Sequence, residues 1–420
     1  MKKNLRRKGK KIFTSLALVT MLGISTTSTA FAKDWTPAET PTAAISKVLE
    51  TGKDVVLPAG MNFKFTINKV SLNDETTDPV KANMPNLTAP DIEITAADEV
   101  TMTNENFRKD VYAKDGDNIL AGFTVNENTV TGIYKYEITE TADTVTVGDA
   151  TKEQVTYDTI KYAFRVYVNE DADGNKYISG TNTVIINKDG TEGTDKIDPT
   201  PGSSETIEGS PEKYSGMKFV NGYSIDKGVV DPGTDPDPEN PNSYGLKVSK
   251  TVTGKVNDTT AFPFNFNVAK PTAVGHEDTT FTYYVFDGTT IGAEQTGTYG
   301  TSITQNLKHN QSIVLKNAYE GSMVAVTEKG VTNYIPSAAV TLNGTTTQVN
   351  AAMGKDLSIG DNKIMGAGAN TIDYTNKFQD MTPTGIIMNN LPFFMLIIVA
   401  FLGIGAFAVI NSRKKRSLNN

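Results

Sequence analysis

Lysine, glutamate and asparagine recur in the same order in both halves of the chain, each on an otherwise apolar strand face. In a strand, residues two apart share a face, and each of these polar residues has apolar neighbours at that spacing. Burying such groups unpaired costs several kcal/mol each, so they must either pair or react. The six residues are Lys47, Glu140 and Asn221 in the first half, and Lys250, Glu328 and Asn376 in the second.

These three residue types can react with one another when they are buried together. Burial favours the neutral lysine and the protonated glutamate. The neutral amine is a nucleophile, and the carboxyl group can donate to the asparagine carbonyl and shuttle protons. Fixed neighbours also act at a high effective concentration. The predicted product is a Lys–Asn isopeptide bond, with loss of ammonia. The alternative is that the charged residues are partly exposed edge residues and the asparagines form turns.

The elements that would position these residues are β-strands. Short runs rich in Val, Ile, Thr, Tyr and Phe alternate with polar residues, for example at 63–67, 133–138, 163–168 and 283–286. There is no long amphipathic helical pattern. The sequence therefore predicts an all-β fold of two tandem Ig-like β-sandwich domains. Residues 189–210, rich in Gly, Thr, Ser and Pro, are expected to form a long loop.

A proline-rich, acidic stretch at 231–243 divides the chain. It is expected to be an extended, semi-rigid linker between a domain at 33–230 and a second domain at 244–379. The sequences of the two domains indicate a degenerate repeat. In this alignment the run from Phe63 to Phe65 corresponds to the run from Phe264 to Phe266.

The N-terminus has the layout of a secretory signal. Residues 1–11 carry seven basic side chains and no acid, an apolar run follows at 12–24, and Ala30-Phe31-Ala32 resembles a cleavage site. We expect residues 1–32 to be a signal peptide, so that Lys33 begins the mature chain. An uncleaved N-terminal anchor is the alternative.

The C-terminus, 381–420, has the three-part layout of a sortase sorting signal. A short motif comes first, then an uncharged apolar run at 391–410, long enough for a transmembrane segment. Four basic residues at 413–416 follow, which keep this end in the cytoplasm. The motif consists of Thr382, Pro383, Thr384 and Gly385, which departs from the common LPxTG. A plain membrane-tethered protein is the alternative.

Charge and composition exclude several classes of function. Without the leader and the tail the chain has 29 basic and 48 acidic side chains, a net charge of −19, which disfavours nucleic acid as a partner. There is no cysteine, so disulfides do not stabilise this exported chain.

No enzyme, metal or cofactor site emerges from the sequence. The only histidines, His276 and His309, have no triad or ligand spacing, and both are expected in surface loops. Residues 169–174 resemble the start of a calcium loop, but position twelve is Gly180 instead of Glu. A hairpin turn is predicted there.

The arrangement of the six polar residues resembles the Ig-like, collagen-adhesin B-type isopeptide domains of streptococcal T-antigen backbone pilins. The resemblance covers nearly the whole ectodomain and is most specific at 246–254 (LKVSKTVTG) and 373–378 (DYTNKF). In that family the lysine lies in the first strand, the glutamate in a Thr-Glu strand and the asparagine in the last strand. The first domain departs from the pattern in its long insert and in Gly222 after Asn221.

This resemblance implies a structural subunit of a Gram-positive pilus, which is not an enzyme. A sortase would cut between Thr384 and Gly385 and transfer Thr384 to peptidoglycan or to a lysine of a neighbouring pilin subunit. Lys213 is the candidate for that lysine and Lys218 the second option. The chain would be exported, inserted in the membrane as a precursor and anchored to the cell wall at the cell surface. A monomeric wall-anchored adhesin that binds a host ligand is the alternative.

Overall fold

The computed structural model describes residues 33–103, 108–202, 205–228 and 235–380, and the helical residues 395–397, 399–402 and 404. The predicted signal peptide and the motif at 382–385 lie outside the described residues, as does most of the predicted transmembrane segment at 391–410. Within the described part of the chain, no helix has the length and apolarity needed to cross a membrane.

The first half of the chain forms a β-sandwich. One sheet has six strands in the order β1-β9-β8-β6-β3-β4, and the facing sheet has the order β20-β12-β2-β5 with β7 beside β12. The strands of the first sheet are β1 (Lys33–Asp34), β3 (Met61–Leu72), β4 (Asp91–Ile94), β6 (Gly132–Thr141), β8 (Lys161–Glu170) and β9 (Lys176–Ile186). Those of the facing sheet are β2 (Ser46–Thr51), β5 (Asp110–Asp115), β7 (Glu153–Thr156), β12 (Lys218–Gly228) and β20 (Asn317–Tyr319).

Smaller elements complete this half. The strands β10 (Glu205–Thr206) and β11 (Lys213–Tyr214) pair with each other. The helices are short: α1 (Asp78–Asn83), η1 (Ala96–Asp98) and η2 (Ile119–Gly122).

The second half forms another sandwich. Its larger sheet has the order β16-β15-β19-β13-β26-β22-β23 with β17 beside β15, and its smaller sheet has the order β18-β14-β21-β24 with β25 beside β21. The larger sheet contains β13 (Leu246–Thr253), β15 (Thr280–Asp287), β16 (Thr290–Ile291), β17 (Gln295–Thr298), β19 (Gln311–Leu315), β22 (Tyr334–Leu342), β23 (Thr345–Asn350) and β26 (Thr371–Phe378). The smaller one contains β14 (Phe262–Ala269), β18 (Ile303–Leu307), β21 (Met323–Glu328), β24 (Leu357–Ser358) and β25 (Lys363–Ile364).

Alternation of apolar and polar residues produces these strands. In β3, Met61, Phe63 and Phe65 are buried and the residues between them are exposed, so one face packs into the core. In β14 the same alternation buries Phe262, Phe264 and Phe266 in a separate core. The four predicted strands lie in β3, β6, β8 and β15, and the predicted all-β class is confirmed.

In each sandwich the first long strand and the last strand lie side by side and run parallel. In β2 and β12, Lys47 is opposite Phe219, two residues before Asn221. In β13 and β26, Lys250 is opposite Tyr374, two residues before Asn376. The two halves therefore repeat the same register between the lysine strand and the asparagine strand.

The repeat differs from the predicted alignment at the phenylalanine strand. Glu140 of β6 is opposite Phe65, and Glu328 of β21 is opposite Phe264. The structural equivalent of Phe63 and Phe65 is therefore Phe262 and Phe264, so the predicted match to the run from Phe264 to Phe266 is wrong by two residues. A proline separates the two aromatic residues in the run Phe262-Pro263-Phe264. The sequence alone therefore did not indicate that this run is the equivalent of Phe63 and Phe65.

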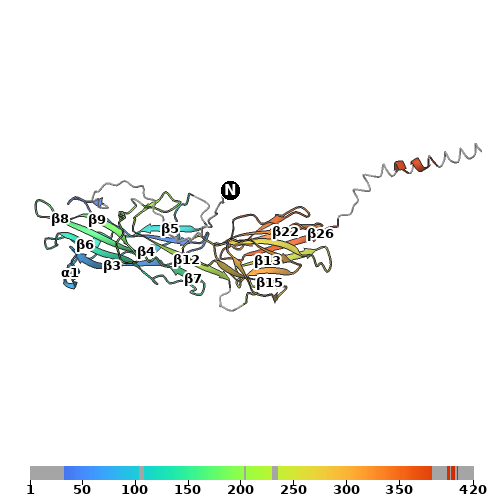
Figure 1. The fold of residues 1–420 in the computed structure, drawn as a ribbon, viewed down its shortest axis with the longest axis horizontal. Helices are drawn as coiled ribbons and strands as arrows, with labels where there is room; N and C mark the ends of the chain where they lie inside the picture. Colours follow the sequence, from blue (N-terminus) through green and yellow to red (C-terminus); the bar gives the residue numbers. More distant parts are fainter. Residues whose placement is uncertain are drawn as a thin grey trace, which may run out of the picture.

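The two sandwiches are joined directly (Figure 1). The end of β12 pairs with β20 of the second half, with Asp226 opposite Tyr319. The predicted extended linker is wrong for residues 237–243, which fold into turns because Ser243 donates to the main chain of Asp237 and Asn240. Its residues 231–234 lie outside the described part.

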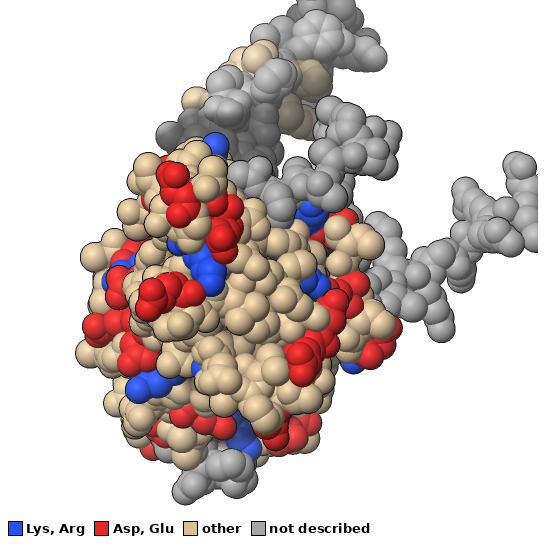
Figure 2. All heavy atoms as spheres, turned by 90° about the vertical axis from the view of Figure 1, so that its left-hand side faces the viewer, with Lys and Arg blue, Asp and Glu red and all other residues tan. Residues whose placement is uncertain are grey.

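Two further predictions are confirmed in the first half. The described residues in the predicted loop, 189–202 and 205–210, contain little regular structure besides the two-residue strand β10. Residues 171–175 form a hairpin turn between β8 and β9, in which Gly174 N–H donates to Asp171 O at 3.1 Å. The end of this sandwich that carries α1 has more acidic than basic side chains around an uncharged central area (Figure 2).

Candidate functional site

The first half brings Lys47, Glu140 and Asn221 together inside its core. Lys47 Nζ lies 2.8 Å from Glu140 Oε1, and both side chains have no exposed surface. Asn221 Nδ2 donates to the same Glu140 oxygen at 2.8 Å. Lys47 Nζ also donates to the carbonyl oxygen of Phe219 at 3.2 Å. One carboxyl oxygen thus bridges the amine of the lysine and the amide nitrogen of the asparagine.

Burial changes the charge balance of this triad. It lowers the pKa of Lys47 to about 8, although the nearby Glu140 opposes the change. It raises the pKa of the Glu140 carboxyl, against the opposing effect of Lys47. Both changes favour the neutral forms, because removing a charge from water is costly. A neutral amine beside a protonatable carboxyl is the arrangement that nucleophilic attack requires.

The second half repeats the triad with Lys250, Glu328 and Asn376. Lys250 Nζ lies 2.7 Å from Glu328 Oε1, and Asn376 Nδ2 donates to the same oxygen at 2.7 Å. Burial lowers the pKa of Lys250 to about 8 and raises that of Glu328. Glu328 Oε2 and Asn376 Oδ1 are buried without a hydrogen-bond partner.

An aromatic ring lies beside each lysine amine. Lys47 Nζ lies 4.6 Å from the centroid of the Phe63 ring, and Lys250 Nζ lies 4.2 Å from that of Phe262. The rings come from equivalent positions of β3 and β14, so the corrected repeat extends to the surroundings of the amines. These rings exclude water from the reacting groups, which strengthens the electrostatic interactions between them.

Asp158, which the sequence does not mark as a site residue, contacts the first triad. Its backbone N–H donates to Asn221 Oδ1 at 2.8 Å and lies 3.3 Å from Glu140 Oε2. Asp158 is in the short segment between β7 and β8, and no local pattern marks that segment as a neighbour of β12. In the sequence, Asp158 is followed by Thr159, and such a pair between two strands is typical of an ordinary turn.

The remaining predicted residues lie elsewhere. Lys213 is exposed on β11, and Lys218 is half-buried with Nζ donating to Thr206 O at 3.2 Å. His309 is exposed, as predicted, and its Nδ1 accepts from Val252 N–H at 3.0 Å. Among the described residues, no group of three or more acidic, histidine or cysteine side chains could hold a metal ion.

The predicted surface position of His276 is wrong. It is only 3% exposed, and its ring centroid lies 4.7 Å from that of Tyr319. The segment before it packs on the first sandwich, since Gly275 lies against Thr156 of β7. The contact between the two domains therefore buries this histidine, and a local sequence pattern gives no sign of such a contact.

Comparison with known proteins identifies the first domain. Residues 43–224 match the family described as the Spy0128-like isopeptide containing domain, and residues 244–360 match a domain of unknown function, DUF7601. This match confirms, for residues 43–224, the predicted resemblance to the isopeptide domains of Gram-positive backbone pilins. No curated protein matches the chain significantly.

Several solved structures are similar to this chain at low identity. The major pilin of Streptococcus pyogenes is 16% identical, with 81% of this chain and 99% of that chain covered and a TM-score of 0.30. A mutant of the same pilin is 16% identical over 80% and 98% of the two chains, with a TM-score of 0.32. The pilus-presented adhesin Cpa is 12% identical over 80% and 100%, with a TM-score of 0.23.

Proposed function

We propose that this chain is a structural subunit of a sortase-assembled cell-surface pilus, with one intramolecular Lys–Asn isopeptide bond in each domain. The observation that carries the proposal is the repeated buried triad. In both domains one glutamate oxygen bridges the amine of a first-strand lysine and the amide nitrogen of a last-strand asparagine. The match of residues 43–224 to isopeptide-containing domains supports it independently.

The bonds would explain how an exported protein without cysteine resists extension. Each bond closes a loop of more than 120 residues. By analogy with disulfides, such a loop closure contributes about 4–5 kcal/mol. In the second domain, tension that enters through β26 passes across the bond from Asn376 to Lys250 and leaves through β13. The residues between them carry no load.

Assembly would use the C-terminal signal. A sortase cuts after Thr384 and transfers it to the amine of Lys213 on a neighbouring subunit, or to peptidoglycan in the last subunit. Lys213 is exposed, which a lysine that accepts an acyl group from another protein requires. Tension from the second domain would then run along β12 to Lys213, while the bond from Lys47 to Asn221 ties the rest of the first domain to that strand.

The intact mass of residues 33–380 tests the proposed bonds. Each bond releases one ammonia and lowers the mass by about 17 Da. We expect a deficit of two ammonias in the wild-type chain and of one in Glu140→Ala or Glu328→Ala. Glu137→Ala, on the opposite face of β6, is the matched control and should keep both bonds. The unmodified sequence mass would refute the bonds and leave a sortase-anchored β-sandwich adhesin as the better interpretation.

A further inference from the structure

The segment between β7 and β8 passes directly over the first triad. Asp158 points its backbone N–H at Asn221 Oδ1, with a donor–acceptor distance of 2.8 Å. This oxygen belongs to the carbonyl group that the lysine amine would attack. A backbone N–H at this distance from a reacting carbonyl oxygen is the geometry of an oxyanion-hole donor.

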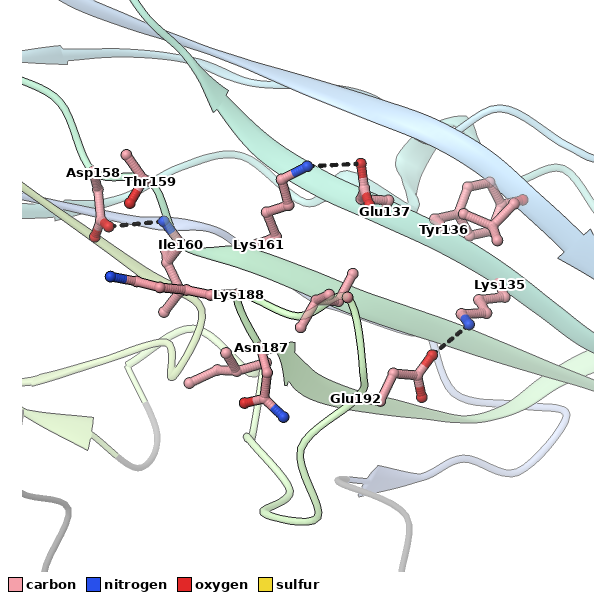
Figure 3. A pocket seen from close by; sticks show the side chains of 14 residues that line it. Lys135, Tyr136, Glu137, Asp158, Thr159, Ile160, Lys161, Asn187, Lys188 and Glu192 are labelled. Atoms are coloured by element: carbon pink, nitrogen blue, oxygen red, sulfur yellow. Dashed lines mark hydrogen bonds and ion pairs between the residues drawn. The ribbon is translucent and has the colours of Figure 1, made fainter.

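The carboxylate of Asp158 holds this N–H in position. Its Oδ2 accepts from Val220 N–H at 2.8 Å, on β12 immediately before Asn221. Its Oδ1 accepts from Ile160 N–H at 2.9 Å, as Figure 3 shows. The pairing of Thr156 with Gly222 fixes the other end of the segment to the same strand. The donor and the reacting amide are therefore anchored to one strand.

We propose that the Asp158 backbone N–H stabilises the oxyanion formed during cross-linking of the first domain, and that the Asp158 carboxylate is its positioning group. This inference rests on the proposed isopeptide chemistry. It assigns to Asp158 a role that the lysine, glutamate and asparagine do not fill, namely stabilising the negative charge that develops on Asn221 Oδ1.

The reaction is balanced with the groups present. The lone pair of neutral Lys47 Nζ attacks Asn221 Cγ, and the carbonyl electron pair moves to Oδ1, where the Asp158 N–H stabilises the charge. Glu140 accepts a proton from Nζ and delivers one to Nδ2, since its Oε1 lies 2.8 Å from each nitrogen. The Cγ–Nδ2 bond breaks, ammonia leaves, and Oδ1 returns to a carbonyl oxygen.

The second domain has no such donor among its described residues. Asn376 Oδ1 is buried and accepts no hydrogen bond. The bridge between the three side chains is alike in the two triads, with distances of 2.7–2.8 Å between each glutamate oxygen and its two nitrogen partners. The proposal therefore predicts that the first domain cross-links faster than the second, and the second serves as an internal control.

The test follows cross-linking in newly synthesised chains of residues 33–380, which contain both hydrophobic cores. Cell-free synthesis is stopped with denaturant at intervals, and peptide masses locate each loss of ammonia. Removing one oxyanion donor in an enzyme costs about 10²–10³ in rate. We expect Asp158→Pro, which lacks the N–H, to slow the first bond by at least about tenfold. Asp158→Ala should also slow it, Asp158→Asn should restore part of the rate, and the second bond should keep its rate in all three.

A second measurement separates this role from a purely structural one. Protease resistance of the first domain is compared in Asn221→Ala chains with and without each of the three substitutions of Asp158. Slow cross-linking in a domain that resists protease as well as its parent supports the proposal. A wild-type rate of cross-linking in Asp158→Ala and Asp158→Pro overturns the proposal. Slow cross-linking also overturns it if each of the three variants has lost protease resistance to a matching degree. Absence of ammonia loss from both wild-type domains would instead refute the proposed bonds themselves.

Discussion

Gly222 of β12 lies against the carbonyl group of Val274 in the second domain. A Cβ atom on Gly222 would be 1.9 Å from Val274 O and 2.3 Å from its carbonyl carbon, so no other residue fits without moving the backbone. Glu50 Oε2 strengthens the same contact by accepting from Val274 N–H at 3.1 Å. The glycine after Asn221, which departs from the family pattern, thus belongs to the joint between the domains.

We expect Gly222→Ala to weaken this joint. The new Cβ would clash with a backbone carbonyl group, so rotation of a side chain cannot relieve the clash, and overpacking of this kind costs about 1–3 kcal/mol. Thermal unfolding should show a lower midpoint for Gly222→Ala than for the wild type, while the mass deficit of two ammonias remains. The control is Gly148→Ala, whose Cβ would meet only the flexible Glu153 side chain, at 3.2 Å. Equal midpoints for the two variants would contradict this account of the joint.

The candidate site was largely predictable because its residues follow a local rule. Lys47, Glu140 and Asn221 each lie two positions from apolar residues on a strand, and this period is visible in the sequence. Asp158 was not predictable, because only the tertiary path of the segment after β7 brings its N–H to Asn221. Local patterns carry no information on such a path.

The errors in the predicted fold have similar causes. The predicted alignment of the phenylalanine strands is wrong by two residues because Pro263 lies between Phe262 and Phe264. A proline at this place interrupts the alternation of apolar and polar residues that the first domain shows. The turns at 237–243 depend on hydrogen bonds from the Ser243 hydroxyl to the main chain, which proline-rich composition does not reveal. His276 is buried by a contact between domains, and the sequence of one domain gives no sign of its neighbour.

The buried lysines should make stability depend on pH when the bonds are absent. Burial lowers the pKa of Lys47 and of Lys250 to about 8, below the ordinary value of 10.5. Asn221→Ala/Asn376→Ala chains cannot form the bonds, and we expect both lysines to keep these lowered pKa values there. Above pH 8 the folded state has therefore lost protons that the unfolded state still binds. The free energy of unfolding should rise with pH in this window, by up to about 1.4 kcal/mol per pH unit for each lysine.

Urea denaturation between about pH 7.5 and about pH 9.5 measures this rise, below the range in which unfolded tyrosines ionise. The same chain with Lys47→Met and Lys250→Met is the control, and its stability should not rise in this range. A flat or falling profile in the chain that keeps both lysines would show that they remain charged in the folded state.

Polymerisation through Lys213 gives the most direct test of the pilus. Lys213 is exposed, whereas Lys218 is half-buried and its amine donates to Thr206 O. Arginine keeps the positive charge of lysine but is always protonated, so it cannot accept the acyl group of Thr384. In cells that contain the sortase, Lys213→Arg should abolish the ladder of high-mass polymers while the monomer stays on the cell wall. Lys218→Arg should leave the ladder intact. A ladder that persists in Lys213→Arg would assign the linkage to another lysine, whereas a wild-type chain that forms no ladder would favour the monomeric adhesin.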